Sequence, residues 1–247
     1  MSAAYTFSHT IDFGTNDLFT SFINPRRAQD GFNLGDMRGN SALDRPHRFV
    51  TSIIWELPWF RRNQNRLVRT LLGGFQFNTI YTAESGQPFT ALSATDSNLN
   101  ADTAGDRALR NPNGIKGTGS NVTSILNSRG QVVGYLATNG NAEYIKAGLG
   151  VQPTAGANTL RSPGTNNFDI SIFKDFEIRE GWRLQFRTEM FNAFNHEQLT
   201  VGGGSVFQLL TNARNLSYAN VSSPTFNDSR IFAGRPRVIQ FGLKLIF

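Results

Sequence analysis

The last nine residues, 239–247, constrain the fold of this chain more than any other segment. In an extended strand, neighbouring side chains point to opposite faces. One face is then wholly apolar and is formed by Ile239, Phe241, Leu243, Leu245 and Phe247. The opposite face carries Gln240, Gly242, Lys244 and Ile246. This pattern is typical of the closing strand of an outer-membrane β-barrel, whose apolar face meets lipid. A half-buried strand of a soluble β-sandwich shows the same alternation, so both interpretations stay open here.

The composition of the chain excludes several kinds of site and partner. The 247 residues include no cysteine, which excludes disulfides and thiolate chemistry. The net charge is +6, but the basic residues are scattered and form no recognisable nucleic-acid-binding module, so we expect no nucleic-acid partner. No run approaches the ~20 apolar residues of a transmembrane helix. Residues 1–7 run directly into strand-like sequence, so we expect no signal peptide within this sequence. None of this counts against a membrane β-barrel, which needs no long apolar run.

Six segments alternate in the manner of β-strands. Most are close to the ~9–11 residues that a tilted strand needs to cross a bilayer. We predict strands near 3–9, 46–57, 70–83, 167–176, 182–191 and 236–247. The predicted fold class is therefore all-β, an antiparallel transmembrane β-barrel fragment.

The connections between these segments alternate in length. Two are short, 58–69 and 177–181. Three are long, 10–45, 84–166 and 192–235, and are rich in Gly, Asn, Ser, Thr and Asp with little periodicity. Long loops without regular structure argue against a compact soluble domain. Alternating short periplasmic turns and long external loops are expected of an outer-membrane barrel.

The barrel hypothesis assigns roles to individual side chains. The terminal apolar face, 239–247, is the expected barrel-assembly signal and meets lipid. A second set is expected to face a wet lumen or a plug: Arg183, Gln185, Arg187, Glu189 and Lys244. With a periplasmic carboxyl terminus, Trp55, Trp59 and Trp182 all fall near the periplasmic rim, where an aromatic girdle belongs.

Several segments together resemble a known family. They include Tyr5–Asp12, Asp44–Val50 leading to Trp55–Pro58, Gly73–Phe77 with Ser85–Thr90, Phe186–His196 and the terminal strand. The set is similar to the C-terminal barrel of TonB-dependent outer-membrane receptors, in particular the Oar-like type with a carboxypeptidase-regulatory-like N-terminal domain. It spans nearly the whole chain in order, although no single piece is diagnostic.

The resemblance implies that the chain is one part of a larger membrane receptor. Members of the family enclose a plug domain in a barrel of ~22 strands. Six strands cannot close around such a lumen, so we expect the C-terminal part of a larger receptor, with no plug domain present in 1–247. The implied partners are outer-membrane lipid, the barrel-assembly machinery, and in the intact protein a plug and TonB-type energy coupling. The resemblance does not identify a ligand.

The sequence shows little sign of a metal site, a catalytic site or a nucleotide-binding loop. Asp96–Asp102 places oxygen side chains at alternate positions, as a Ca²⁺ loop begins, but Ala101 and Arg107 stand where such a loop needs Gly and Glu. His9, His47 and His196 lack metal-ligand spacing. No nucleophile elbow or Walker loop occurs, so we expect no catalytic residues, no metal, no cofactor and no enzyme. Two rivals remain: a structural or adhesive surface barrel that displays loops, and a soluble β-sheet binding domain.

Overall fold

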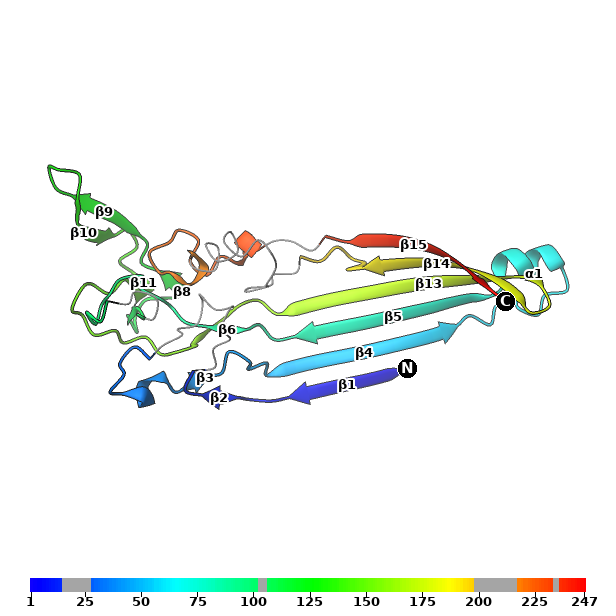
Figure 1. The fold of residues 1–247 in the computed structure, drawn as a ribbon, viewed down its shortest axis with the longest axis horizontal. Coiled ribbons are helices and arrows are strands. Elements are labelled where there is room, and N and C mark those ends of the chain that lie inside the picture. The colour runs from blue at the N-terminus through cyan, green and yellow to red at the C-terminus, as the bar shows by residue number, and fades with distance from the viewer. Residues whose placement is uncertain (15–27, 102–105, 198–216, 233–235) are drawn as a thin grey trace.

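A six-stranded antiparallel sheet organises the molecule (Figure 1). The computed structural model describes residues 1–14, 28–101, 106–197, 217–232 and 236–247. The spatial order of the strands is β1-β4-β5-β13-β14-β15. Their bounds are Ser2–Phe7, His47–Glu56, Phe75–Glu84, Thr165–Arg179, Trp182–Phe191 and Val238–Ile246. The strands lie side by side along the long axis in Figure 1.

The two ends of this sheet differ. One end carries the connection 57–74, the two-residue turn between β13 and β14, and the carboxyl terminus (Figure 1). We call it the short-turn end. At the opposite, long-loop end lie the connections β1–β4, β5–β13 and β14–β15. Gly181 at the tight turn has φ of +78°, a conformation that glycine adopts without the cost of a Cβ.

The first short connection contains a helix that the sequence analysis placed partly in a strand. The predicted strand 70–83 was wrong at its start, because α1 spans Arg66–Leu72 and β5 begins only at Phe75. The Asn65 side chain caps α1 by accepting a hydrogen bond from the Leu67 amide at 2.9 Å. Gly74, with φ of +73°, then redirects the chain into the sheet.

The long loops are not devoid of regular structure, contrary to the interpretation of 84–166. Small elements occupy the long-loop end: β2 Ile11–Asp12, η1 Leu34–Met37, β3 Gly39–Asn40, β6 Pro88–Phe89, β7 Leu109–Arg110, β8 Ile115–Gly119, β9 Val122–Leu126, β10 Val132–Ala137, β11 Ala142–Ile145, β12 Leu160–Arg161 and η2 Ser229–Phe232. The strands among them form two-stranded and three-stranded sheets, and η1 and η2 are 3-10 helices. We call residues 28–45, 85–101, 106–164 and 217–232 the loop cap.

The apolar core lies in the loop cap and not under the main sheet. Phe89 and Tyr218 are fully buried, with ring centroids 4.6 Å apart. A neighbouring cluster adds Tyr144 and Val221 with several buried alanines. The backbone of Leu92 pairs with that of Ala219, N to O at 2.8 Å, which joins two loops far apart in sequence.

Candidate functional site

The register of the main sheet separates its side chains onto two faces. Directly opposed residues of antiparallel strands share a face. On β14 and β15 these pairs include Leu184 with Leu245 and Phe186 with Leu243. The alternate pairs include Gln185 with Lys244 and Glu189 with Gln240. We call these two surfaces the apolar face and the polar face.

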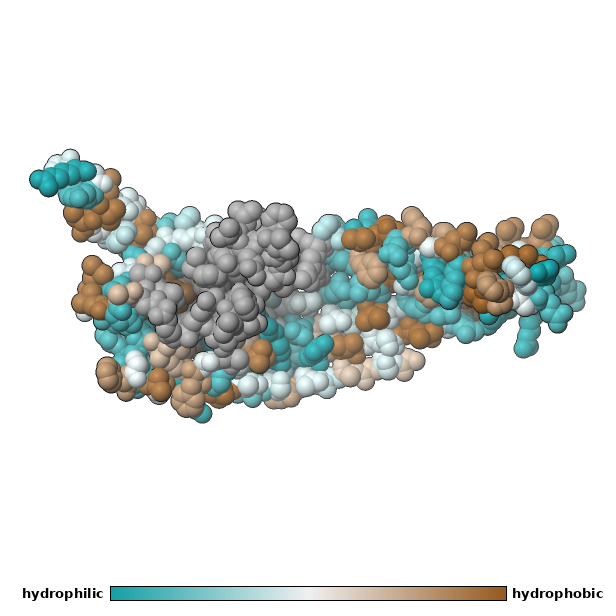
Figure 2. All heavy atoms as spheres, in the orientation of Figure 1, coloured by the Kyte–Doolittle hydropathy of each residue, from teal (hydrophilic) through white to brown (hydrophobic). Residues whose placement is uncertain are grey.

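The apolar face leaves large side chains uncovered. Ile239, Phe241, Leu243 and Leu245 are 45–69% exposed, and Phe247 is 85% exposed. Burial of one such side chain is worth about 1.5–3 kcal/mol, so an uncovered face of this size is unfavourable in water. In Figure 2 apolar residues, in brown, lie at the visible surface along the strands. An apolar solvent is the environment that suits this face.

The polar face carries all five residues predicted to line a lumen. Arg183, Gln185, Arg187 and Glu189 lie on β14, and Lys244 lies opposite Gln185 on β15. The structure therefore places them on one surface. Whether that surface encloses a lumen stays a prediction.

Hydrogen bonds join this surface into a ladder. Gln185 Nε2 donates to Asp175 Oδ1 at 2.8 Å, and Arg187 Nε donates to Gln185 Oε1 at 2.6 Å. The Arg183 guanidinium lies 3.6 Å from the other Asp175 oxygen. Arg187 also sits 4.9 Å from the centre of the Phe173 ring. The ladder is half-exposed, which suits contact with water or with a polar partner.

The sequence analysis missed Asp175 at the centre of this ladder. Its position depends on the register of β13 against β14, in which Asp175 opposes Gln185. One sequence shows which residues alternate along a strand but not which neighbour they face. The alternation of Asp169, Ser171, Asp175 and Glu177 was the available indication.

All three tryptophans lie towards the short-turn end, as predicted for one girdle. The Trp55 and Trp59 rings meet edge to face with centroids 5.6 Å apart. Trp182 stacks on Phe247 at 5.5 Å, and Arg179 covers the Trp182 ring at 4.5 Å. The terminal aromatic is thereby fixed beside the turn that starts β14. Its role as a girdle stays a prediction.

The loop cap holds buried charges at its base. Arg107 is 1% exposed, donates to Gln29 Oε1 at 2.7 Å and forms an ion pair with Asp36. Burial lowers the pKa of Arg107. Burial also raises the pKa of Asp106, against the opposing effect of hydrogen bonds from Ser97. These contacts join the segment that carries Arg107 to those that carry Gln29 and Asp36.

A second buried ion pair fastens the loop cap near β4. Asp44 is fully buried, accepts a hydrogen bond from the Thr10 amide at 2.8 Å and pairs with Arg161. Burial by itself raises the pKa of Asp44, but the hydrogen bonds from Thr10 and Arg161 outweigh it, so the pKa is lowered. The ion pair thus joins the β1–β4 connection, which carries Thr10 and Asp44, to the β5–β13 connection, which carries Arg161.

The candidate calcium loop is held by its own backbone. Both carboxylate oxygens of Asp96 accept hydrogen bonds, from the amides of Asn100 and Ala101 at 2.9 Å. Asp102 lies outside the described residues. Across the part of the chain that the structure describes, no group of three His, Asp or Glu side chains is arranged to hold a metal.

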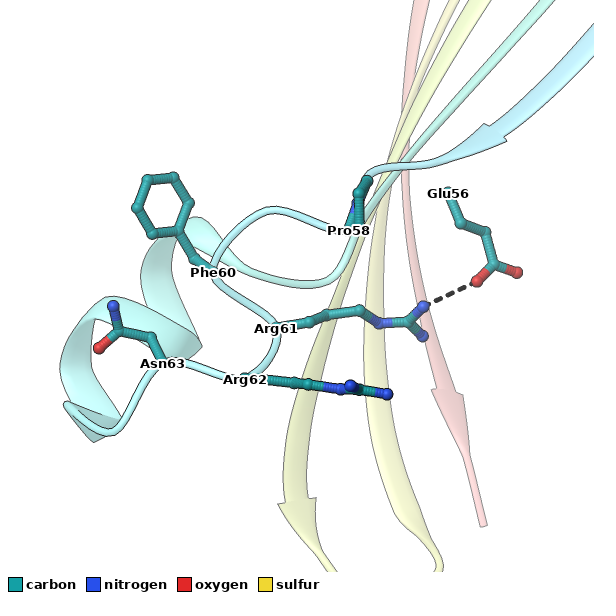
Figure 3. A pocket seen from close by; sticks show the side chains of 6 residues that line it. All are labelled: Glu56, Pro58, Phe60, Arg61, Arg62 and Asn63. Carbon is teal, nitrogen blue, oxygen red and sulfur yellow. Dashed lines mark hydrogen bonds and ion pairs between the residues drawn. The ribbon is translucent and has the colours of Figure 1, made fainter.

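A pocket opens at the short-turn end (Figure 3). It has a volume of about 720 Å³. Its lining residues are Glu56, Pro58, Phe60, Arg61, Arg62 and Asn63. Figure 3 shows Arg61 and Arg62 extending together away from Phe60, with Arg61 bound to Glu56 at 2.8 Å. Both partners of this ion pair are more than half exposed, so it adds little stability.

An antiparallel sheet with one polar face and one uncovered apolar face is the structure expected of part of an outer-membrane β-barrel. A family model described as "Outer membrane beta barrel domain" matches residues 1–240, and the chain belongs to this family. The protein is located in the outer membrane. No curated protein and no solved structure matches the chain. Among the described residues, no helix is both long enough and apolar enough to span a membrane.

Proposed function

We propose that this chain forms part of the barrel of a TonB-dependent outer-membrane receptor of the Oar-like type. The observation that carries the proposal is the combination of a hydrogen-bonded polar face with an ordered loop cap at one end of the same strands. A receptor needs both a wet interior and a shaped external surface. The assignment to the TonB-dependent, Oar-like type comes from the resemblance of the sequence segments.

In this proposal the long-loop end is external and the short-turn end is periplasmic, as in other barrels of this kind. The apolar face meets lipid. Arg183, Gln185, Arg187, Glu189 and Lys244 line the lumen or contact a plug domain. The terminal strand, ending at Phe247, is recognised by the barrel-assembly machinery. Transport is driven by plug movement and not by catalysis on this chain.

The open edges of the sheet support a larger barrel. Within the described residues, β1 and β15 lie at the two edges and do not pair with each other. An unpaired backbone group in lipid costs several kcal/mol, so both edges must pair with further strands in the membrane. We assign those strands to the same intact barrel.

A display barrel is the second candidate. Hairpin β9–β10 projects from the loop cap, clear of the other elements (Figure 1). Its exposed apolar residues include Leu126, Val133 and Leu136, each 56–63% exposed. In Figure 2 apolar residues, in brown, lie beneath the hydrophilic tip of this hairpin. Such a surface fits adhesion as well as ligand capture.

The composition of the native protein separates the two candidates. The protein that carries this chain would be purified from outer membranes, and its intact mass and peptide map would be measured. A receptor predicts a plug domain and an energy-coupling segment in the same polypeptide. A polypeptide with strands but neither segment would contradict the receptor and favour the display barrel.

A further inference from the structure

The connection between β4 and β5 presents an uncovered amphipathic helix. None of the seven residues of α1 is buried, and Leu67, Leu71 and Leu72 are 51–71% exposed. At about 100° per residue, the apolar side chains of α1 fall on one side of the helix and the others on the opposite side. The apolar side consists of Leu67, Val68, Leu71 and Leu72, and the polar side of Arg66, Arg69 and Thr70. A helix this short gains most of its stability from whatever covers its apolar side.

Two contacts hold this connection against the apolar face of the sheet. Trp59 packs on Trp55, whose register partner Phe77 belongs to that face. Lys174 also lies on the apolar face and donates to the Gly73 carbonyl, at the end of α1. These two contacts tie the connection to the apolar face at Trp59 and at Gly73.

The charge of the connection is one-sided. Residues 57–74 contain Arg61, Arg62, Arg66 and Arg69 and no acidic residue. The nearby Glu56 forms an ion pair with Arg61. Arg66 and Arg69 are exposed beside the apolar side of α1. A basic amphipathic helix with an adjacent tryptophan has the composition of helices that lie in the plane of a membrane interface.

We propose that α1 and Trp59 insert into the interface of the periplasmic leaflet, where Arg66 and Arg69 bind the phosphates of anionic phospholipids. The leaflet assignment rests on the orientation given under the proposed function. A guanidinium binds phosphate through paired N–H donors. The turn then serves as an anchor that fixes the depth of β4 and β5 in the bilayer.

Spin labels can measure this depth. The chain contains no cysteine, so Leu71→Cys gives one labelled position within it. Leu243→Cys on the apolar face serves as the lipid reference, and Arg129→Cys at the tip of hairpin β9–β10 as the water reference. The native protein with each change would be reconstituted in phosphatidylcholine vesicles with and without phosphatidylglycerol. Collision with oxygen and with a water-soluble nickel complex would then be compared.

We expect label 71 to be shielded from the nickel complex at least fivefold relative to label 129, and more strongly when phosphatidylglycerol is present. Arg66→Gln with Arg69→Gln should abolish the effect of phosphatidylglycerol. The control pair Lys116→Gln with Arg129→Gln removes the same charge from the loop cap and should leave it unchanged. Equal access of nickel to labels 71 and 129 would overturn the insertion of α1. If label 71 were shielded equally with and without phosphatidylglycerol, the proposed binding of anionic lipid by Arg66 and Arg69 would be overturned.

A second measurement separates this inference from the orientation. An impermeant maleimide added to whole cells should label Arg129→Cys and leave Leu71→Cys unlabelled. Failure to label Arg129→Cys would place the long-loop end inside and contradict the proposed orientation. Labelling at 129 only, with label 71 open to nickel in vesicles, would contradict the anchor and leave the orientation standing.

Discussion

The main sheet and the loop cap place their apolar side chains differently. The sheet leaves them exposed on one face, and the loop cap buries them. In the sheet, Phe241 and Leu243 are more than two-thirds exposed, while the opposite face holds a ladder of charged and amide groups. In the loop cap, Phe89 and Tyr218 are fully buried and charges such as Arg107 are paired beneath the surface. The cap is thus built for water. The apolar face of the sheet suits lipid and its polar face suits water or a polar partner, so exposure of an apolar residue has a different meaning in the two regions.

The largest effect is expected in the loop cap. Phe89→Ala removes a fully buried ring that packs on Tyr218, and such truncations cost about 3–5 kcal/mol. We expect the cap to become sensitive to protease while the sheet remains folded in detergent. Leu126→Ala, at an exposed position of hairpin β9–β10, is the matched control and should change neither. Simultaneous loss of the sheet would show that the two regions do not fold separately.

The next effect concerns the apolar face. Leu243→Arg places a charge near the middle of β15, where lipid contact makes it cost about 2–4 kcal/mol. Gln240→Arg, on the polar face of the same strand, should cost under about 1 kcal/mol because that side chain stays hydrated. Urea titration of the protein in vesicles measures both. Equal losses of stability in Leu243→Arg and Gln240→Arg would show that the two faces do not differ in their surroundings.

A smaller effect is expected at α1. Asn65→Ala removes the side-chain cap of the helix and should destabilise it by about 1 kcal/mol. Asn65→Asp retains an acceptor oxygen and is the control. Hydrogen exchange of the amides of Leu67 and Val68 would report the change. No increase in their exchange rate would argue that the lipid interface, and not the cap, maintains this helix.

The smallest effect is a pH dependence of the loop cap. The folded-state pKa of Asp44 lies below its ordinary value of 3.8. The resulting stabilisation is therefore fully present above pH ~3.8 and is lost as the pH falls through the lowered pKa. The Asp44→Asn variant should lose less stability than the native protein over this acidic window. Parallel losses in the two proteins would show that Asp44 is not responsible.

The sheet could be predicted from the sequence because the alternation of each strand is local. Strands such as Trp182–Phe191 appear within their predicted bounds, and the five residues assigned to the lumen share one face. The cap could not be predicted, because its core joins Phe89 to Tyr218 and Arg107 to Asp36 across long stretches without periodicity. Helix α1 could have been predicted, since Asn65 precedes Leu67 and Leu71 at helical spacing, but residues 70–72 were assigned to the following strand.

Alternating cysteine labelling along β15 tests the central assignment of the two faces most directly. Single cysteines at 240, 241, 242, 243 and 244 would be treated with a water-soluble maleimide in the native protein reconstituted in vesicles. Our account predicts labelling at 240, 242 and 244 and protection by lipid at 241 and 243. Uniform labelling, or protection with the opposite alternation, would contradict it.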